Sequence, residues 1–163
     1  MKYTAQAVIQ APVEAIDLET WLFTLSDAEY QAAARGHRAA GTFVQDGRRG
    51  TVNVETVGGT LLIQHYLEQQ AGPTHVDMLS ERSRGYLFHL VPVPVWVRWT
   101  LTAEPRDHAT ATFTCTVEVD LPLLLRPAAA LVGTPLFLRR HVHEETRLFA
   151  ADIERKLAGA RVS

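Results

Sequence analysis

Side-chain polarity alternates with a period of two through most of the chain between Arg38 and Asp120. The alternation is cleanest over residues 109–120, where threonines and a glutamate separate an apolar set that consists of Ala111, Phe113, Cys115, Val117 and Val119. Successive side chains of a strand point to opposite faces of its sheet, so this pattern predicts a strand with one buried face and one solvated face. One-sided strands are typical of antiparallel sheets and argue against a stack of βαβ units.

Turn residues divide this region into strands. Asp46-Gly47 and Gly58-Gly59 are dipeptides of the hairpin type, and Ala71-Gly72-Pro73 and Pro105-Arg106-Asp107 are further turns. A first strand ends at Pro12, and later strands are expected near residues 38–45, 50–57, 60–70, 74–80, 83–91, 93–103 and 109–120. The sequence therefore predicts a curved antiparallel sheet of about seven strands.

Helical patterns lie on either side of the long run of strands. Residues 13–34 contain helix formers at loose helical spacing, and Ser26 with Glu29 matches a capping box, so a short helix should begin there. The C-terminal segment carries an apolar stripe made of Leu138, Val142, Phe149, Ile153 and Leu157. We predict a long C-terminal helix that lies across the sheet face carrying Phe113 and Cys115.

Composition narrows the possible classes of protein. The chain has 163 residues, 47% of them hydrophobic, which fits one domain over residues 1–163. Its net charge of −2 argues against strong non-specific nucleic-acid binding, which requires a basic face. Cys115 is the only cysteine, which excludes a disulfide framework and a zinc site with several thiolates. The first residues lack the apolar core of a signal peptide, and we expect a cytoplasmic protein.

Residues 121–138 are mostly apolar and approach the length of a membrane-spanning helix. Arg126 and three prolines within this segment argue against a span, because a span would have to bury a guanidinium and lose backbone hydrogen bonds. We predict no integral membrane span and interpret the segment as buried core or as a lid. The remaining alternative is an exposed surface that docks a partner protein or a membrane.

The order of these elements resembles the START-like superfamily, also called SRPBCC or helix-grip. The likeness is carried by the first strand with Ala11-Pro12-Val13-Glu14, by the strands between Arg38 and Asp120, and by the closing helix with Arg139-Arg140-His141-Val142-His143-Glu144-Glu145. It spans nearly the whole chain, and no motif in it assigns a subfamily. The resemblance implies an α+β fold in which the curved sheet grips the C-terminal helix, with short helices after the first strand.

The resemblance also implies a cavity between the sheet and the C-terminal helix. Members of the superfamily bind lipids, sterols, hormones or polyketides in that cavity, and some act as cyclases or aromatases. We therefore expect this protein to bind a small apolar or lipid-like molecule. The alternatives are a polyketide cyclase or aromatase-type enzyme, and an interaction protein that docks through residues 121–138. Whether the protein is an enzyme stays open at this stage.

His65 is the candidate for chemistry in this cavity. It shares the parity of Leu61, Ile63 and Leu67, which predicts that it points inward with them. An inward imidazole could take a proton α to a carbonyl while a hydroxyl or an arginine stabilises the enolate. It could equally be a core histidine that binds a backbone carbonyl or a water molecule.

Other candidate ligand contacts come from the inward faces of the predicted strands and helix. Trp99 offers a flat apolar surface with an N–H donor, whereas Cys115 should be an inert buried thiol. Parity does not decide whether Phe88 or His89 points inward, because both faces of residues 83–91 are apolar. The candidate ligand contacts are His65, Ile63, Leu67, Phe88, Val97, Trp99, Phe113, Cys115, Val142 and Phe149. Every one of them could also be plain core packing.

Histidines and glutamates on the closing helix suggest a metal site at first sight. His141 and Glu145 share a helix face, but His141 and His143 lie roughly 200° apart around the helix and cannot converge. A catalytic zinc site needs three convergent ligands, and only His65 is conceivable as the third. We therefore predict no metal and no cofactor, and interpret these residues as a solvated helix flank. Apolar residues on the second face of the sheet, such as Trp96, suggest a possible homodimer.

Overall fold

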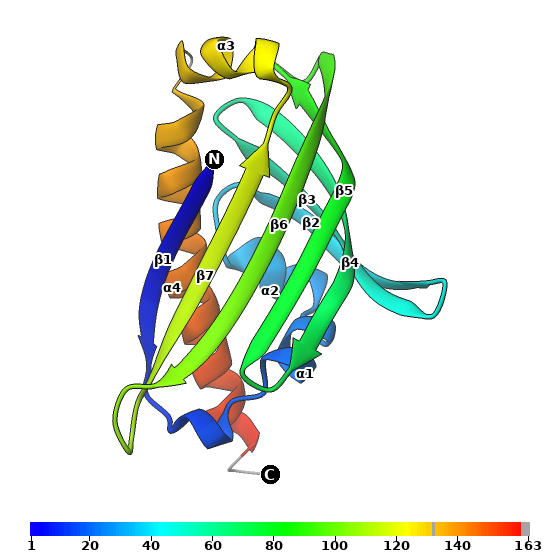
Figure 1. Cartoon of the computed structure of the whole chain (residues 1–163). Coiled ribbons are helices and arrows are strands. Elements are labelled where there is room, and N and C mark those ends of the chain that lie inside the picture. Colours follow the sequence, from blue (N-terminus) through cyan, green and yellow to red (C-terminus); the bar gives the residue numbers. More distant parts are fainter. Residues whose placement is uncertain (132, 161–163) are drawn as a thin grey trace.

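A seven-stranded antiparallel sheet wraps around one long helix (Figure 1). The computed structural model describes residues 1–131 and 133–160. The strands are β1 (Lys2–Ile9), β2 (His37–Gln45), β3 (Arg48–Val57), β4 (Thr60–Gly72), β5 (His75–Leu87), β6 (Val91–Pro105) and β7 (Ala111–Asp120). Their order in the sheet is β1-β7-β6-β5-β4-β3-β2, so β2 to β7 form a meander and β1 pairs with β7. The predicted antiparallel α+β architecture is confirmed.

The helices lie on the concave side and at the ends of this sheet (Figure 1). They are η1 (Val13–Ala15), α1 (Leu18–Phe23), α2 (Asp27–Ala32), η2 (Leu123–Leu125), α3 (Arg126–Leu131) and α4 (Thr134–Ala160). The long helix α4 packs against β1, β7 and β3, while α1 packs against β4 to β6 and α2 against β2. The apolar residues expected on the stripe of α4 face the sheet, and Val142, Phe149 and Ile153 are among the most buried residues.

The predicted strands at 74–80 and 83–91 are one continuous strand, β5. Its register against β6 shifts between Ser80 and Ser83, whose buried hydroxyls hydrogen-bond each other at 2.7 Å. This bulge places Glu81 and Arg82 in solvent, which gives the sequence the polarity of a turn where the strand in fact continues. The actual turn lies at residues 88–90. The expected hairpin turns at Asp46-Gly47 and Gly58-Gly59 are confirmed, and their φ angles are positive, as such turns require.

The inner faces of β6 and β7 agree with the predicted parity. Val93, Val95, Val97, Trp99 and Leu101 are buried, as are Ala111, Phe113, Cys115 and Val119. The ring of Phe149 from α4 lies against this wall, 5.9 Å from the ring of Trp99 and 5.0 Å from that of Trp21 on α1. These aromatic side chains form the solid part of the core, where sheet, α1 and α4 meet.

The inner face of β4 has the opposite polarity from the one that the sequence predicts. Gln64 and Tyr66 of β4 are buried, while Ile63, His65 and Leu67 lie on the outer face. The predicted inward orientation of Ile63, His65 and Leu67 is therefore wrong. The inner face of β3, for which the sequence predicts no orientation, is also largely polar, and its buried set is Thr51, Asn53, Glu55 and Val57. Polar side chains are stable inside because they bind one another, as Gln64 Nε2 does by donating to Glu55 Oε1 at 2.8 Å.

The apolar segment at 121–138 folds as η2, α3 and the start of α4, apart from residue 132, which lies outside the described part. It covers one end of the space between sheet and helix, near the turn between β5 and β6 (Figure 1). Its own Ala129 and Leu138 are buried, but Leu124 is 91% exposed and Leu131 89%. None of the described helices is long and apolar enough to cross a membrane.

Glu29 ties α2 to α4. It completes the expected capping box with Ser26, and its two oxygens accept hydrogen bonds from Arg155 at 2.8 Å and from Lys156 at 3.0 Å. Partial burial alone would raise the pKa of Glu29, but the hydrogen bonds from Ser26 and the two cations lower it to about 2. The ionised form of Glu29 is therefore more stable in the folded protein than in the unfolded chain.

Acidification should remove this contribution to stability. A carboxyl whose folded pKa is lowered stabilises fully above its unfolded pKa of 4.5 and loses that effect as the pH falls towards about 2. We expect Glu29→Gln to cost roughly 1–3 kcal/mol in the free energy of unfolding at pH 7, and the difference from wild type to shrink below pH 4.5. Urea denaturation from pH 7 to pH 3 measures this, with the exposed Glu14→Gln as control. A difference that stays constant with pH would contradict it.

Candidate functional site

Four ionisable side chains meet in the space between the sheet and α4, which we call the grip. His37 begins β2, Glu55 lies on the inner face of β3, and His141 and Glu145 lie one turn apart on α4. His37 is 3% exposed, Glu55 7%, His141 9% and Glu145 5%. Charged residues are rarely buried this deeply unless they are paired, so a cluster of four in the interior marks a candidate site.

Hydrogen bonds fix two of the four groups firmly against each other. The ring nitrogen Nε2 of His141 lies 2.8 Å from Oε2 of Glu55, whose other oxygen accepts the hydrogen bond from Gln64. Gly36 makes this approach possible, because a side chain there would start 2.7 Å from the carbonyl oxygen of Thr56 and 3.2 Å from the His141 ring. The pair joins β3 directly to α4.

Only one of the two ring nitrogens of His37 has a hydrogen-bond partner in the described part of the chain. Its Nδ1 lies 2.6 Å from the carbonyl oxygen of Tyr30, and its ring stacks on the Tyr30 ring with a centroid separation of 3.8 Å. A carbonyl only accepts, so Nδ1 carries the proton and Nε2 carries the lone pair. That Nε2 atom lies 3.9 Å from an oxygen of Glu55 and 3.9 Å from an oxygen of Glu145, and it has no hydrogen-bond partner among the described residues.

The Glu55–His141 pair is ionised near neutral pH. Burial alone would raise the pKa of Glu55, but the charge and hydrogen bond of His141 lower it to about 2, with smaller contributions from His37 and Gln64. Burial alone would lower the pKa of His141, but the charge and hydrogen bond of Glu55 raise it to about 9. Each partner thus stabilises the charge of the other.

The other two groups are neutral near pH 7. Burial raises the pKa of Glu145 to about 8; the charge of Glu55 adds to this effect and the charge of His141 opposes it. Burial lowers the pKa of His37 to about 4, although the charge of Glu55 and the hydrogen bond to Tyr30 oppose this. The site therefore combines a buried ion pair, a neutral carboxylic acid and a neutral imidazole with a free lone pair.

A small cavity adjoins the cluster within the grip, and a second cavity shares part of its wall. The first, of about 20 Å³, has a polar end formed by Asn53, Glu55, Gln64, Tyr66, His141 and Glu145. The second, of about 50 Å³, lies under α3 and is mostly apolar; its lining is Val57, Thr60, Leu62, Leu87, Val93, Val95, Val119, Leu121, Ala129, Thr134 and Leu138. Leu62, Val119 and Leu138 line both cavities. The space thus runs from an apolar end to a polar end.

Six of the ten sequence-predicted ligand contacts lie inside the grip, and only two of these line a cavity there. Trp99 and Val142 line the polar cavity. Val97, Phe113, Cys115 and Phe149 are buried in the solid core instead. Cys115 accepts a hydrogen bond from Nε1 of Trp99 at 3.3 Å, and burial raises the pKa of its thiol, as expected of an inert cysteine.

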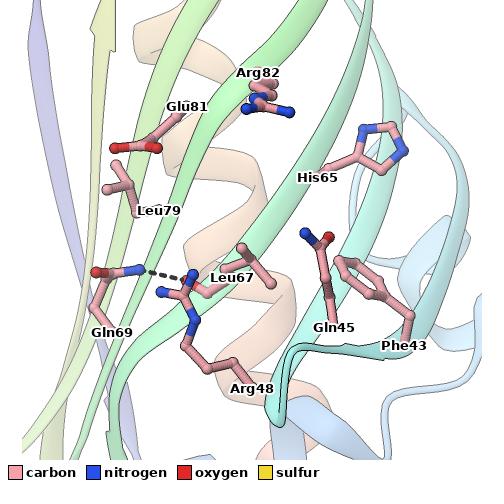
Figure 2. A pocket seen from close by; sticks show the side chains of 9 residues that line it. All are labelled: Phe43, Gln45, Arg48, His65, Leu67, Gln69, Leu79, Glu81 and Arg82. Carbon is pink, nitrogen blue, oxygen red and sulfur yellow. Dashed lines mark hydrogen bonds between the residues drawn. The ribbon is translucent and has the colours of Figure 1, made fainter.

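The other four predicted contacts lie outside. His65 and Leu67 line a cleft of about 360 Å³ on the outer face of the sheet, together with Phe43, Gln45, Arg48, Gln69, Leu79, Glu81 and Arg82. Figure 2 shows this cleft, with α4 on the far side of the strands. Ile63 shares the outer face, and Phe88 is 69% exposed in the turn at 88–90, where its φ of 52° ends the strand. His65 is therefore excluded as the general base of an interior site.

Sequence reasoning missed His37 and Glu55 and placed His141 and Glu145 on a solvated flank. That assignment is wrong for His141 and Glu145, and so is the argument that no three ligands converge. Donor atoms of His37, Glu55 and His141 all lie within 4.8 Å of one another. The only sequence signal was the strict polar alternation in β3, at Thr51, Asn53 and Glu55, which parity alone cannot assign to the inner face.

Solved structures are similar to this chain over nearly its whole length. An aromatase/cyclase, ZhuI from Streptomyces sp. R1128, superposes with a TM-score of 0.67 at 10% identity, covering 98% of this chain and 97% of that one. A START superfamily protein from Mycobacterium smegmatis gives 0.61 at 10% identity with 98% of both chains covered. A protein from Thermus thermophilus gives 0.62 at 12% identity, covering 98% of this chain and 99% of that one.

These likenesses, together with the topology, show that the chain has a START-like fold. The resemblance stated from the sequence is confirmed at the level of the fold, and no subfamily is assigned. No protein-family model matches the sequence, and no curated protein matches it significantly.

The buried ion pair can be tested by a double-mutant cycle in buffer that contains a chelator. Glu55→Gln and His141→Gln should each cost about 3–5 kcal/mol in the free energy of unfolding, because each leaves a buried polar partner unpaired. The double variant should cost less than the sum, by about 1–3 kcal/mol. Denaturant unfolding measures all three, and the half-buried Glu144→Gln, which should change stability by less than about 0.5 kcal/mol, is the control. Strict additivity would show that the two residues are not coupled.

Proposed function

We propose that the protein binds a small, mostly apolar molecule with one polar end in the space between the sheet and α4. The observation that carries this proposal is the gradient along the two adjoining cavities, from apolar walls under α3 to the buried polar cluster. Ligand sites in proteins are largely apolar with a few placed polar groups, and this space has that composition. The likeness to START and aromatase/cyclase structures supports the same location.

The polar end offers a ligand several hydrogen-bonding groups. Gln64 and Tyr66 bring an amide and a phenol to the cavity, and Glu145 brings a carboxyl that is neutral near pH 7. These groups suit a carbonyl or hydroxyl better than a second buried charge, because the cluster already contains an ion pair. We therefore expect a neutral ligand with an oxygen at one end.

The space between the sheet and α4 must widen before a ligand can enter it. Cavities of about 20 and 50 Å³ are far smaller than the roughly 300–1,000 Å³ of typical ligand sites. The cover over the apolar end is α3, whose Ala129 lines that cavity. Gly133, with a φ of 77°, lies between α3 and α4 and is suited to act as a hinge. We propose that α3 moves outward about this glycine when a ligand enters.

Probe binding tests the location of the site. We expect N-phenyl-1-naphthylamine, a neutral fluorescent probe, to bind the wild-type chain, and Leu138→Phe to weaken binding at least about tenfold by filling the junction of the two cavities. Leu136→Phe, on the exposed side of the same helix, is the matched control and should bind normally.

A second pair of variants separates interior binding from binding to the exposed apolar end. Leu124→Ser and Phe88→Ser remove large exposed side chains and should leave probe binding unchanged. If these changes abolish binding while Leu138→Phe does not, the probe binds the surface and the proposal fails. Native mass spectrometry of the purified protein, followed by denaturing extraction, independently identifies any molecule that the protein carries.

A second candidate function is cyclase-type acid–base chemistry, and one observation favours it. The cavity contains a histidine, His141, beside a carboxyl group, Glu145, although it is not the histidine that the sequence suggested. In such a reaction Glu145, once ionised above a pKa of about 8, would take a proton α to a ketone, and the positive charge of His141, whose pKa is about 9, would stabilise the enolate oxygen. The likeness to the Streptomyces aromatase/cyclase supports the same chemistry.

Proton exchange tests this chemistry without knowledge of the natural substrate. We expect the wild-type chain to accelerate deuterium exchange at the α carbons of 2-tetralone, an apolar bicyclic ketone, in D₂O followed by NMR, with the acceleration rising as Glu145 ionises through its pKa of about 8. Glu145→Gln should remove most of the acceleration, about 100-fold or more, because the base is lost. His65→Gln, on the outer face, should leave the rate unchanged. Equal rates with and without protein would reject this second function and leave the binding proposal intact.

A further inference from the structure

The free nitrogen of His37 lies at the centre of the polar cluster. The side chain of His37 has no exposed surface, and its Nε2 has no hydrogen-bond partner in the described part of the chain. This buried lone pair faces two carboxyl groups at 3.9 Å and accepts a hydrogen bond from neither, so a cation bound among the three groups would satisfy all of them. The Nδ1 contact to the carbonyl of Tyr30 fixes the tautomer in the way that is usual for histidines that bind a metal.

The neighbouring donor atoms converge, since those of His37, Glu55 and His141 all lie within 4.8 Å of one another. His37 Nε2 lies 3.9 Å from Glu55 Oε2, and His141 Nε2 lies 2.8 Å from the same oxygen. Ligand atoms of a tetrahedral zinc site with bonds of about 2.0–2.1 Å lie about 3.3 Å apart. Small side-chain movements would therefore bring all three atoms into coordination.

We propose that His37, Glu55 and His141 bind one Zn²⁺ ion, with Glu145 as an adjacent carboxylate. The ion would replace the proton between His141 and Glu55, since a histidine must be deprotonated to act as a ligand. Two imidazoles and a carboxylate favour zinc over Mg²⁺ and Ca²⁺, which prefer oxygen ligands alone. With both carboxylates ionised, the site would be electrically neutral, which lowers the cost of burying the ion.

The location gives the ion access to the ligand space. Glu55, His141 and Glu145 all line the polar cavity, so the ion would lie at its polar end. Three protein ligands leave the fourth position of a tetrahedral ion free for a water molecule or a ligand oxygen. Zinc binding itself rests on the cluster alone and does not depend on the proposed binding function.

The test uses the full chain after treatment with a chelator. Calorimetric titration with Zn²⁺ should give one ion per chain, and Co²⁺ should give the visible ligand-field bands of a tetrahedral site. Zn²⁺ should also raise the Tm, because it binds the folded state, whereas Mg²⁺ or Ca²⁺ at the same concentration should not. His37→Gln should lower the Zn²⁺ affinity by about 100-fold or more, and Glu145→Gln by about tenfold.

His143→Gln is the matched control, since His143 is exposed on the same helix two residues from His141. It should bind Zn²⁺ like the wild type, and loss of binding in this variant would show a surface site and overturn the proposal. No saturable binding, or unchanged affinity in a folded His37→Gln variant, would also overturn it. If His37→Gln fails to fold, ¹⁵N NMR of the wild-type chain decides the question, because Zn²⁺ must shift the Nε2 resonance of His37.

Discussion

The ion pair between Glu55 and His141 is the contact on which the interior of this protein depends. It joins a strand of the sheet to the long helix through a bond of 2.8 Å in a region that water hardly reaches. A pair of this kind is stable only when both partners are present and further hydrogen bonds satisfy them. Gln64 supplies such a bond, and Gly36 keeps the space that the ring of His141 needs.

This pair also explains why the inner faces of β3 and β4 are largely polar. Because Glu55 must face α4, the rest of its parity set on β3 faces inward with it, and so does Gln64 on β4. The apolar residues of the same strands then lie on the outer face, where Leu67 helps to line the outer cleft. One buried contact thus sets the orientation of two strands, since the side chains of a strand cannot change face independently.

The sequence predicted the parts of the fold that local patterns determine. The alternation in β7, the glycine turns and the Ser26–Glu29 cap depend on neighbours in the chain, and the structure has them where they were expected. The predicted orientation of β4 was wrong because a parity rule that places apolar residues inside cannot detect an interior face that carries polar groups. The cluster itself brings together residues from β2, β3 and α4, with Glu55 and His141 separated by 86 positions, so no local spacing reveals it.

Stability alone does not explain why the interior contains this polar cluster. Well-packed apolar residues in place of a buried ion pair are often neutral or stabilising by about 1–4 kcal/mol. The interior nevertheless contains the pair, a neutral carboxyl and an imidazole nitrogen without a partner among the described residues, all at the closed end of an apolar space. A group that lacks a partner in the folded chain is best explained by a partner from outside it. An ion at His37 would satisfy that nitrogen, and a ligand beneath α3 would fill that space.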